Sequence, residues 1–136
     1  MTVYWDTSGI IRYLTSNRLP EIKGVTRTHT LAELFSTLSG RGIDTIKADG
    51  TIRHKRLSMR LAAKVISEIF PRLKFVDLSP GEALAIILEA KAVGAQGARI
   101  HDLMHAAAAD KANADELWTA DENDFAGLGR VAVKQL

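Results

Sequence analysis

One stretch decides the fold: VYWDTSGII, residues 3–11. Its first three residues form a short apolar run of strand-forming side chains, and Asp6 follows directly. Beyond it, Ile10, Tyr13 and Leu14 recur at helical spacing. A strand that ends at a carboxylate and leads at once into a helix is the start of a β–α unit. We therefore expect Asp6 at the carboxyl end of a strand.

The same alternation continues along the rest of the chain. The pattern predicts further strands at residues 24–27, 74–78, 117–120 and 131–133, and further helices at residues 31–38, 57–70, 80–93 and 100–107. Alternating strands and helices predict an α/β fold with a mostly parallel central sheet and helices on both faces. Since domains usually span about 100–200 residues, we expect a single domain over residues 1–136.

Local signals refine this prediction. Ser79 to Glu82 combines an N-cap serine, a proline at the first helical position and a glutamate two residues later, which is a strong helix start. Thr30 and Glu33 have the spacing of a second capping box. Residues 41–56 are polar, charged and glycine-bearing, so we expect a loop or connector there.

One helix prediction concerns burial. After the start at Ser79, the apolar residues Leu84, Ile87 and Leu88 follow helical spacing. We expect this stripe to face the core.

Composition narrows the class of protein. The chain has no cysteine, which excludes disulfides, a thiolate nucleophile and a thiolate zinc site. The N-terminus lacks the features of a signal peptide, and no apolar run approaches the roughly 18 residues that a membrane span needs. We therefore expect a soluble, cytoplasmic protein with no membrane contact.

The charge is unevenly distributed, although the net value is only +2. Residues 41–74 contain nine Lys and Arg against three acids, whereas residues 75–136 contain five against ten. This asymmetry suggests that one surface binds a polyanion and another binds a metal. An ordinary solvated helix face explains the pattern equally well.

Four acids fall at the end of a predicted strand or in the first turn of a predicted helix: Asp6, Glu33, Asp102 and Asp121. Two unit charges about 4 Å apart repel by roughly 4 kcal/mol at an effective dielectric near 20. No Lys or Arg is adjacent to them, so a divalent cation is the simplest source of compensation. Singly, each acid is explained as a helix cap, a first-turn anion or a turn residue.

Sequence context sharpens the case, because the four acids lie in four ordered motifs. These motifs are VYWDTSGII at residues 3–11, TLAEL at 30–34, RIHDLMHAAAA at 99–109 and LWTADENDF at 117–125. Together they resemble the PIN-domain family, and especially the ribonuclease toxins of VapC type from toxin–antitoxin pairs. The resemblance extends over nearly the whole chain.

The resemblance implies a PIN-like three-layer α/β/α sandwich with an acidic metal site that cleaves RNA. It assigns the catalytic and metal-binding positions to Asp6, Glu33, Asp102 and Asp121, and supporting positions to Thr7, Thr119 and Asp124. Some relatives have Asn in place of the fourth acid, so Asp124 is an alternative to Asp121. The resemblance also implies a cognate antitoxin protein and a homodimer.

The implied reaction is hydrolysis of an RNA phosphodiester bond. Oxygen ligands without cysteine favour Mg²⁺ or Mn²⁺. Such an ion polarises a phosphoryl oxygen and acidifies water. We expect Thr119 to form a hydrogen bond to a carboxylate or to a ligand water. The basic residues Arg53, Arg56, Arg60 and Lys64 follow helical spacing and could form a ridge along the RNA path.

Other functions fit less well. His101 and His105 are spaced for zinc binding, but Asp102 occupies the place of the glutamate in the familiar motif. An Asp-nucleophile phosphotransferase would need an acid two residues after Asp6, where Ser8 stands. The remaining alternative is a non-catalytic α/β nucleic-acid-binding module whose acids are helix caps. Calorimetry with Mn²⁺ separates this module from an enzyme.

Overall fold

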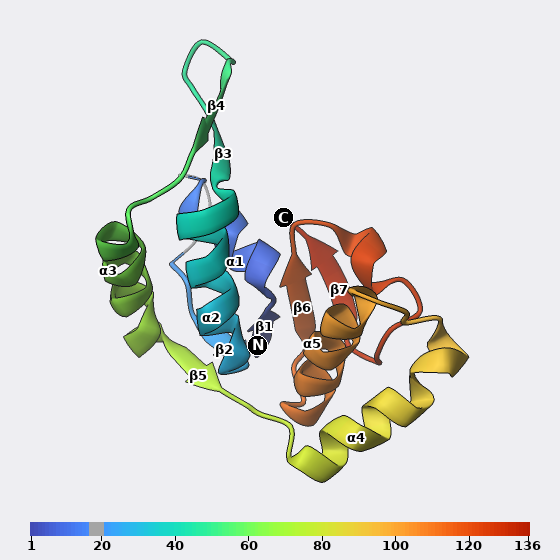
Figure 1. Cartoon of the computed structure of the whole chain (residues 1–136). Coiled ribbons are helices and arrows are strands. Elements are labelled where there is room, and N and C mark those ends of the chain that lie inside the picture. Colours follow the sequence, from blue (N-terminus) through green and yellow to red (C-terminus); the bar gives the residue numbers. More distant parts are fainter. Residues whose placement is uncertain (17–20) are drawn as a thin grey trace.

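The computed structural model describes residues 1–16 and 21–136, in which helices surround a five-stranded parallel sheet (Figure 1). The strand order is β5 (Leu73–Phe75), β2 (Gly24–Thr26), β1 (Val3–Trp5), β6 (Glu116–Thr119) and β7 (Ala132–Gln135). All four neighbouring pairs are parallel. The prediction of an α/β fold with a mostly parallel central sheet is confirmed.

Side chains alternate across β1, so the central strand contributes to two separate cores. On one face, Val3 and Trp5 pack with apolar residues of α1 (Thr7–Leu14), α2 (His29–Ser36) and α3 (Met59–Ile69). On the other face, Tyr4 packs with α5 (Arg99–Lys111), and α4 (Pro80–Glu89) lies against α5. The sheet therefore lies between two layers of helices.

The carboxyl ends of β1 and β6 lie side by side and position the candidate site. Trp5 is in register with Trp118, and the amide of Asp6 donates to the carbonyl oxygen of Trp118 at 3.3 Å. Gly9, in the first turn of α1, sits against that carbonyl. A Cβ on Gly9 would lie 2.4 Å from the Trp118 oxygen, so only glycine allows this close approach.

The capping box predicted at Thr30 is wrong. Thr28 precedes the first residue of α2 without a capping hydrogen bond, and Thr30 lies inside the helix. Thr30 instead shares a hydrogen bond of 2.8 Å with Thr26, whose hydroxyl also donates to the Trp5 carbonyl. Glu33 is therefore not needed as a cap. At Ser79 the predicted capping box is present in full.

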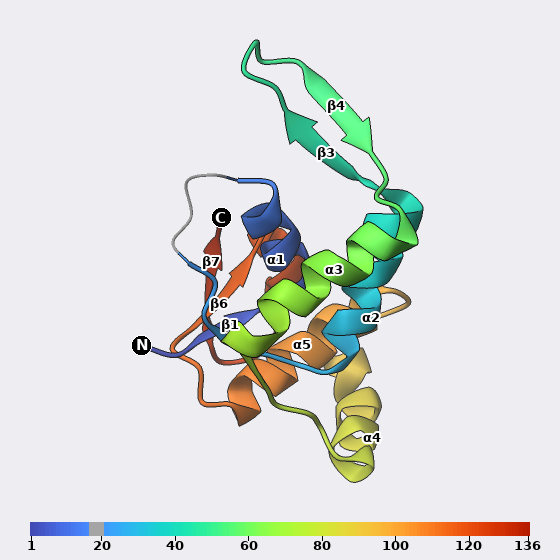
Figure 2. The ribbon, with the colours of Figure 1, turned by 90° about the vertical axis from the view of Figure 1, so that its left-hand side faces the viewer.

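Residues 41–56 form a β-hairpin and not the loop or connector that the sequence suggested. Its antiparallel strands are β3 (Ile43–Ile46) and β4 (Ile52–Lys55), and the hairpin projects from the rest of the molecule (Figure 2). Gly50 has a φ of +85° in the connecting turn, a conformation that glycine adopts freely. Because β4 is extended, Arg53 does not continue a helical ridge with Arg60.

The burial predicted for α4 is also wrong. Leu84, Ile87 and Leu88 are 56%, 52% and 75% exposed, whereas Ile86 and Ala90 pack against the core. An apolar helix stripe is thus left uncovered. None of the helices in residues 1–16 and 21–136 combines the length and apolar character that crossing a bilayer requires.

Short helical turns complete the connections. They are a π-helical turn η1 (Thr37–Arg41) and the 3₁₀ turns η2 (Phe70–Arg72), η3 (Ala90–Val93) and η4 (Glu122–Phe125). η1 leads from α2 into the hairpin, and η4 follows the carboxyl end of β6. η4 therefore borders the edge of the sheet where Asp6 lies.

Candidate functional site

Asp6 lies at the end of β1 and is the N-cap of α1. The amide of Gly9 donates to its Oδ1 at 2.6 Å, and the hydroxyl of Thr119 donates to its Oδ2 at 2.7 Å. Burial raises the pKa of Asp6, while these two donors oppose the shift. The carboxylate is held in one orientation at the carboxyl edge of the sheet.

A hydroxyl network connects Asp6 to the end of β6. Ser8 Oγ lies 3.0 Å from both carboxylate oxygens of Asp6 and 3.0 Å from Thr119 Oγ1, and it accepts from the amide of Ala120 at 3.0 Å. The contact from Thr119 to a carboxylate, expected from the sequence, is present. Residues more than 100 positions apart are thus joined through hydroxyl groups.

Asp102 lies in the first turn of α5 and is half-buried. Burial, followed by the charges of Asp124 and Asp6, raises the pKa of Asp102 to about 6. His105 and Arg99 oppose this shift only in part. The acids from the ends of β1 and β6 and from α5 are therefore close enough to repel one another.

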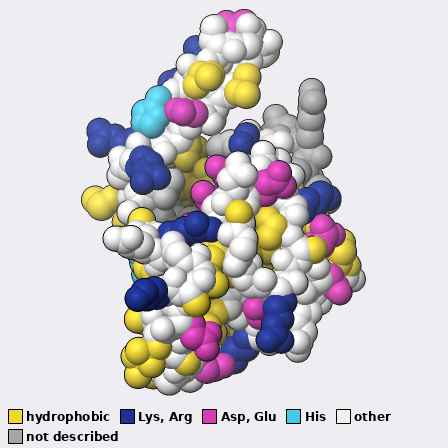
Figure 3. Space-filling view, turned by 90° about the vertical axis from the view of Figure 1, so that its right-hand side faces the viewer, with side chains coloured by type: hydrophobic (Ala, Val, Ile, Leu, Met, Phe, Trp, Pro, Cys, Tyr) yellow, Lys and Arg dark blue, Asp and Glu magenta, His cyan; other side chains and the backbone are white. Residues whose placement is uncertain are grey.

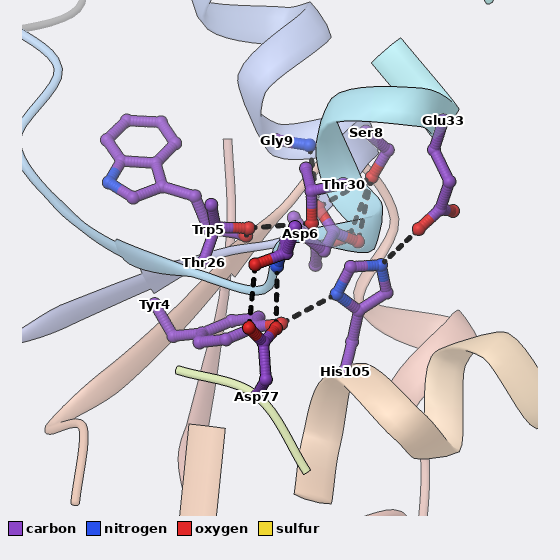
Figure 4. A network of polar contacts seen from close by, with 12 residues as sticks. Tyr4, Trp5, Asp6, Ser8, Gly9, Thr26, Thr30, Glu33, Asp77 and His105 are labelled. Atoms are coloured by element: carbon purple, nitrogen blue, oxygen red, sulfur yellow. Dashed lines mark hydrogen bonds and ion pairs between the residues drawn. The ribbon is translucent and has the colours of Figure 1, made fainter. Parts of the chain in front are cut away.

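Glu33 reaches the same region from α2 and contacts His105. Nε2 of His105 lies 3.2 Å from Oε1 of Glu33, although the two atoms are not aligned as a regular hydrogen bond. Burial alone would raise the pKa of Glu33, but His105, His29 and Arg27 together lower it. Figure 4 shows His105 between Glu33 and Tyr4, whose hydroxyl lies 2.8 Å from Nδ1 of the imidazole.

These side chains line a hollow of about 870 Å³. Asp6, Glu33, Asp102 and Asp124 are among its lining residues. In the space-filling view, acidic side chains gather below the projecting hairpin (Figure 3). Three of the four acids assigned from the sequence thus share one hollow.

Asp121 is the acid that does not line the hollow. It is exposed and caps η4, where its Oδ1 accepts from the amide of Asn123 at 3.0 Å. Asp124, three residues later, lines the hollow in its place. The structure therefore separates the two acids that the sequence left as alternatives.

The donor set suits a hydrated hard cation. Within residues 1–16 and 21–136, no three His, Asp or Glu side chains lie close enough to hold a metal ion by themselves. Mg²⁺, however, usually retains several waters and binds one or two carboxylates together with substrate phosphates. Thr7 adds a buried hydroxyl oxygen that has no hydrogen-bond partner among the described residues. The residues present fit such an ion.

Sequence reasoning missed the basic groups of the site. Arg12 and Arg41 line the same hollow, and Arg99 and Arg27 act on the pKa values of Asp102 and Glu33. The expectation that no Lys or Arg answers the acidic charge is wrong, because separate helices bring arginines to the hollow. Arg99 precedes Asp102 by three residues on one helix, which was a usable signal, whereas Arg41 is distant in sequence from all four acids except Glu33 and gave none.

Two histidines, His105 and His29, also line the hollow, and the sequence singled out only the first of them. The sequence singled out His105 only for its spacing to His101, whereas the structure places it in the hollow as a buried side chain. Its position three residues after Asp102, on the same side of one helix, was a usable signal. His29 lines the hollow as well, and its ring lies nearly parallel to that of His101, with centroids 6.2 Å apart.

Comparison with known proteins supports the fold. No family model matches the sequence, and no curated protein matches it. Among solved structures, the chain is similar to one from VapBC-1 of nontypeable Haemophilus influenzae, with a TM-score of 0.63 and 22% sequence identity. The match covers 99% of this chain and 98% of that chain. At this identity the likeness establishes the α/β fold.

Proposed function

We propose that this chain is a single PIN-like domain that hydrolyses RNA phosphodiester bonds with the help of Mg²⁺ or Mn²⁺. The observation that carries the proposal is the convergence of Asp6, Asp102 and Asp124, whose mutual repulsion contributes to the raised pKa of Asp102. A chain that keeps such repulsion gains from a cation bound there. The similarity to a chain of VapBC-1 supports the same reading at the level of fold.

The proposal gives each acid a role. Asp6, Asp102 and Asp124 hold the ion directly or through water, with Asp124 in the fourth position that the sequence gave first to Asp121. Glu33 binds the ion or orients the attacking water. When bound, the ion supplies Lewis-acid activation of the phosphoryl group and of water. Ser8 and Thr119 keep the Asp6 carboxylate in its orientation through the hydrogen bonds described above.

The arginines of the hollow suit a phosphodiester substrate. Arg12 and Arg41 line the hollow together with the acids, so the cavity presents both signs of charge. Guanidinium groups bind phosphate oxygens in a planar, bidentate geometry. We assign Arg12 and Arg41 to the flanking phosphates of the RNA, whereas the acids act at the scissile phosphate.

A toxin role predicts partners, and the surface offers apolar faces for them. On and beside α3, Met59, Leu61 and Phe70 are 72%, 39% and 49% exposed. These exposed apolar side chains lie on both sides of the buried stripe of α3 and at its end, and we propose that the cognate antitoxin binds against this helix. The exposed stripe of α4, with Leu84 and Leu88, is suited to a homodimer contact.

A second candidate is the non-catalytic nucleic-acid-binding module. It is favoured by one specific observation: Asp6 and Asp121 both act as N-caps, so structure alone accounts for them. Asp102 and Asp124 lie in first helical turns, where an anion is favourable, but this does not explain why both carboxylates lie close enough to Asp6 to raise the pKa of Asp102. The two candidates differ in whether a divalent ion binds in the hollow.

The proposal is tested by incubating the purified protein with total RNA in the presence of Mg²⁺, Mn²⁺ or EDTA. The ends of the cleaved RNA are then mapped. Cleavage is expected with either ion and not with EDTA. Asp102→Asn and Asp124→Asn should abolish it, whereas Asp121→Asn, the same chemical change outside the hollow, should retain it. Cleavage in EDTA would contradict the metal dependence. Loss of cleavage in the Asp121→Asn variant alone would contradict the roles given to Asp102 and Asp124.

A further inference from the structure

The hairpin of β3 and β4 has two chemically different faces. In an antiparallel pair, residues opposite each other point to the same side of the ladder, and the side alternates with each pair. One face carries the pairs Ile43–Lys55 and Thr45–Arg53, and the other carries Asp44–His54 and Ile46–Ile52. Figure 3 shows hydrophobic, acidic and histidine side chains together on one side of the projecting hairpin. The basic residues of β4 thus share the opposite side.

The basic charge of the hairpin is not neutralised. Residues 41–56 contain five Lys and Arg but only two acids, Asp44 and Asp49. Asp44 pairs with His54 at 2.7 Å, and Asp49 accepts two hydrogen bonds from Thr51 in the turn. None of the five basic side chains forms an ion pair with an acid in the described part of the chain. The hairpin therefore presents unpaired positive charge to solvent.

The hairpin is fixed at its base, which belongs to the hollow. Arg41, Gly42, Ile43 and Asp44 are lining residues of the hollow. His54 Nε2 lies 3.0 Å from the carbonyl oxygen of Arg41. At Gly42 the backbone has a φ of +86°, and an added Cβ would lie 2.7 Å from that Nε2. The exposed ladder thus starts from a base that is held in place.

Packing within the chain does not explain why the hairpin projects into solvent. A two-stranded hairpin is marginal in water without further packing, and every residue of β4 is exposed. No Phe, Trp or Tyr lies in residues 41–56, so the hairpin has no ring on which a base could stack. Exposed guanidinium and ammonium groups without aromatic neighbours favour phosphate contacts, which carry no base sequence information.

We propose that this hairpin is an arm that binds the RNA backbone outside the hollow, through Arg53 and Lys55 on its basic face. The identity of the bound strand rests on the proposed ribonuclease function. The arm adds affinity for any single strand that extends beyond the cleavage site, and a strand confined to the hollow does not gain from it. Recognition of this kind is independent of sequence and weakens as salt rises.

Binding of a fluorescein-labelled single-stranded oligouridine, followed by anisotropy in EDTA, tests the arm without cleavage. Each phosphate contact on a single strand contributes about 0.7 to the slope of log affinity against log salt. The double variant Arg53→Gln/Lys55→Gln should therefore lower the magnitude of this slope by about 1.4. Between about 50 and 200 mM salt, the affinity of the variant should then fall by a factor about sevenfold smaller than the affinity of the wild type. Arg53→Lys/Lys55→Arg, which keeps both charges, should retain the wild-type slope.

The matched control lies on the opposite face of the same ladder. Ile46→Ser/Ile52→Ser should leave the slope unchanged. Three results would each refute the proposal that the hairpin binds RNA. They are an unchanged slope in the Gln double variant, the absence of RNA binding by the wild type, and a loss of RNA binding in the Ser double variant. Failure of the ribonuclease proposal is read separately in the cleavage assay. If the wild type cleaves RNA but the Gln double variant has the wild-type slope, only the proposal of an RNA-binding arm is refuted. If the slope of the Gln double variant is lower but the wild type does not cleave RNA, only the proposal of ribonuclease activity is refuted.

Discussion

His105 lies between two buried or half-buried polar groups, with Nε2 at 3.2 Å from Oε1 of Glu33 and Nδ1 at 2.8 Å from the hydroxyl of Tyr4. Burial raises the pKa of Tyr4, so the phenol keeps its proton and can donate to Nδ1. In a neutral imidazole the other nitrogen, Nε2, then carries the proton and faces Glu33. Tyr4 thereby sets which side of His105 presents a donor to the carboxylate.

Amide substitutions at His105 test this orientation. Glutamine places an N–H near the position of Nε2, whereas asparagine reaches only the position of Nδ1. We expect His105→Gln to preserve Mn²⁺ affinity, and His105→Asn to weaken it severalfold, since Glu33 then loses the polar N–H group that lies 3.2 Å from its carboxylate. Calorimetric titration of Mn²⁺ measures both. Equal affinities in the two variants would contradict the role given to Nε2.

Stability should depend on pH through Asp102. Its pKa is about 6 in the folded state and near 3.8 in the unfolded chain, so the folded state binds the proton more readily between these values. This carboxyl therefore favours folding below about pH 4, and that contribution is lost as pH rises through about 6.

Asp102→Asn removes this dependence. We expect the variant to unfold at a higher temperature than the wild type at pH 7.5, and the difference to shrink toward pH 4. Thermal unfolding in EDTA measures it. Asp121→Asn, the same chemical change at an exposed acid outside the hollow, is the control and should show no such trend. A wild type more stable than Asp102→Asn at pH 7.5 would contradict the burial and repulsion assigned to Asp102.

Two buried threonines make a matched pair for hydrogen-bond energetics. Thr119→Val removes a donor from the buried Asp6 carboxylate and should cost about 1.5–3 kcal/mol of unfolding free energy. Thr26→Val removes a donor to the neutral Trp5 carbonyl and should cost about 1 kcal/mol. Urea unfolding measures both values. The expected order fails if Thr26→Val proves the more damaging change.

Gly9 and Gly81 respond in opposite ways to alanine. An added Cβ at Gly9 would lie 2.4 Å from the Trp118 carbonyl oxygen, so overpacking should cost about 1–3 kcal/mol and displace Asp6. At Gly81, in α4, nothing lies within 4 Å, and alanine should stabilise by up to about 1 kcal/mol. Chemical denaturation measures both, and a stable Gly9→Ala variant would refute the close approach of α1 to β6.

Sequence patterns predicted the fold where the cause is local. The apolar run before Asp6 and the capping box at Ser79 act within a few residues, and both are found as expected. The hairpin was missed although Asp49-Gly50 is a common hairpin turn, because each flanking strand has only four residues and most of these residues are polar or charged. Helical spacing located the apolar stripe of α4 but could not tell whether anything covers it.

The site was predictable only in part for the same reason. Asp6 follows a strand and Asp102 lies in a first helical turn, and such positions meet at one edge of a parallel sheet, so the sequence placed both in one hollow. Glu33 reaches the same hollow from beyond the first turn of α2, which begins two residues earlier than the sequence suggested. The choice between Asp121 and Asp124 depends on the single turn η4, which spacing does not determine. Arg12 lies on the helix that Asp6 caps, so its nearness to that acid was predictable, whereas Arg41 reaches the hollow through tertiary packing, which no local pattern indicates.

The pairing of β1 with β6 has a consequence during translation. The two strands lie more than 100 residues apart in sequence, so a nascent chain that has not yet exposed residues 116–119 cannot place Thr119 against Asp6. Long-range strand pairing of this kind is slow to form. The contact between Thr119 and Asp6 therefore forms only after residues 116–119 have left the ribosome. If the proposed function is right, a nascent chain that stops short of β6 has no cleavage activity against the RNA around it.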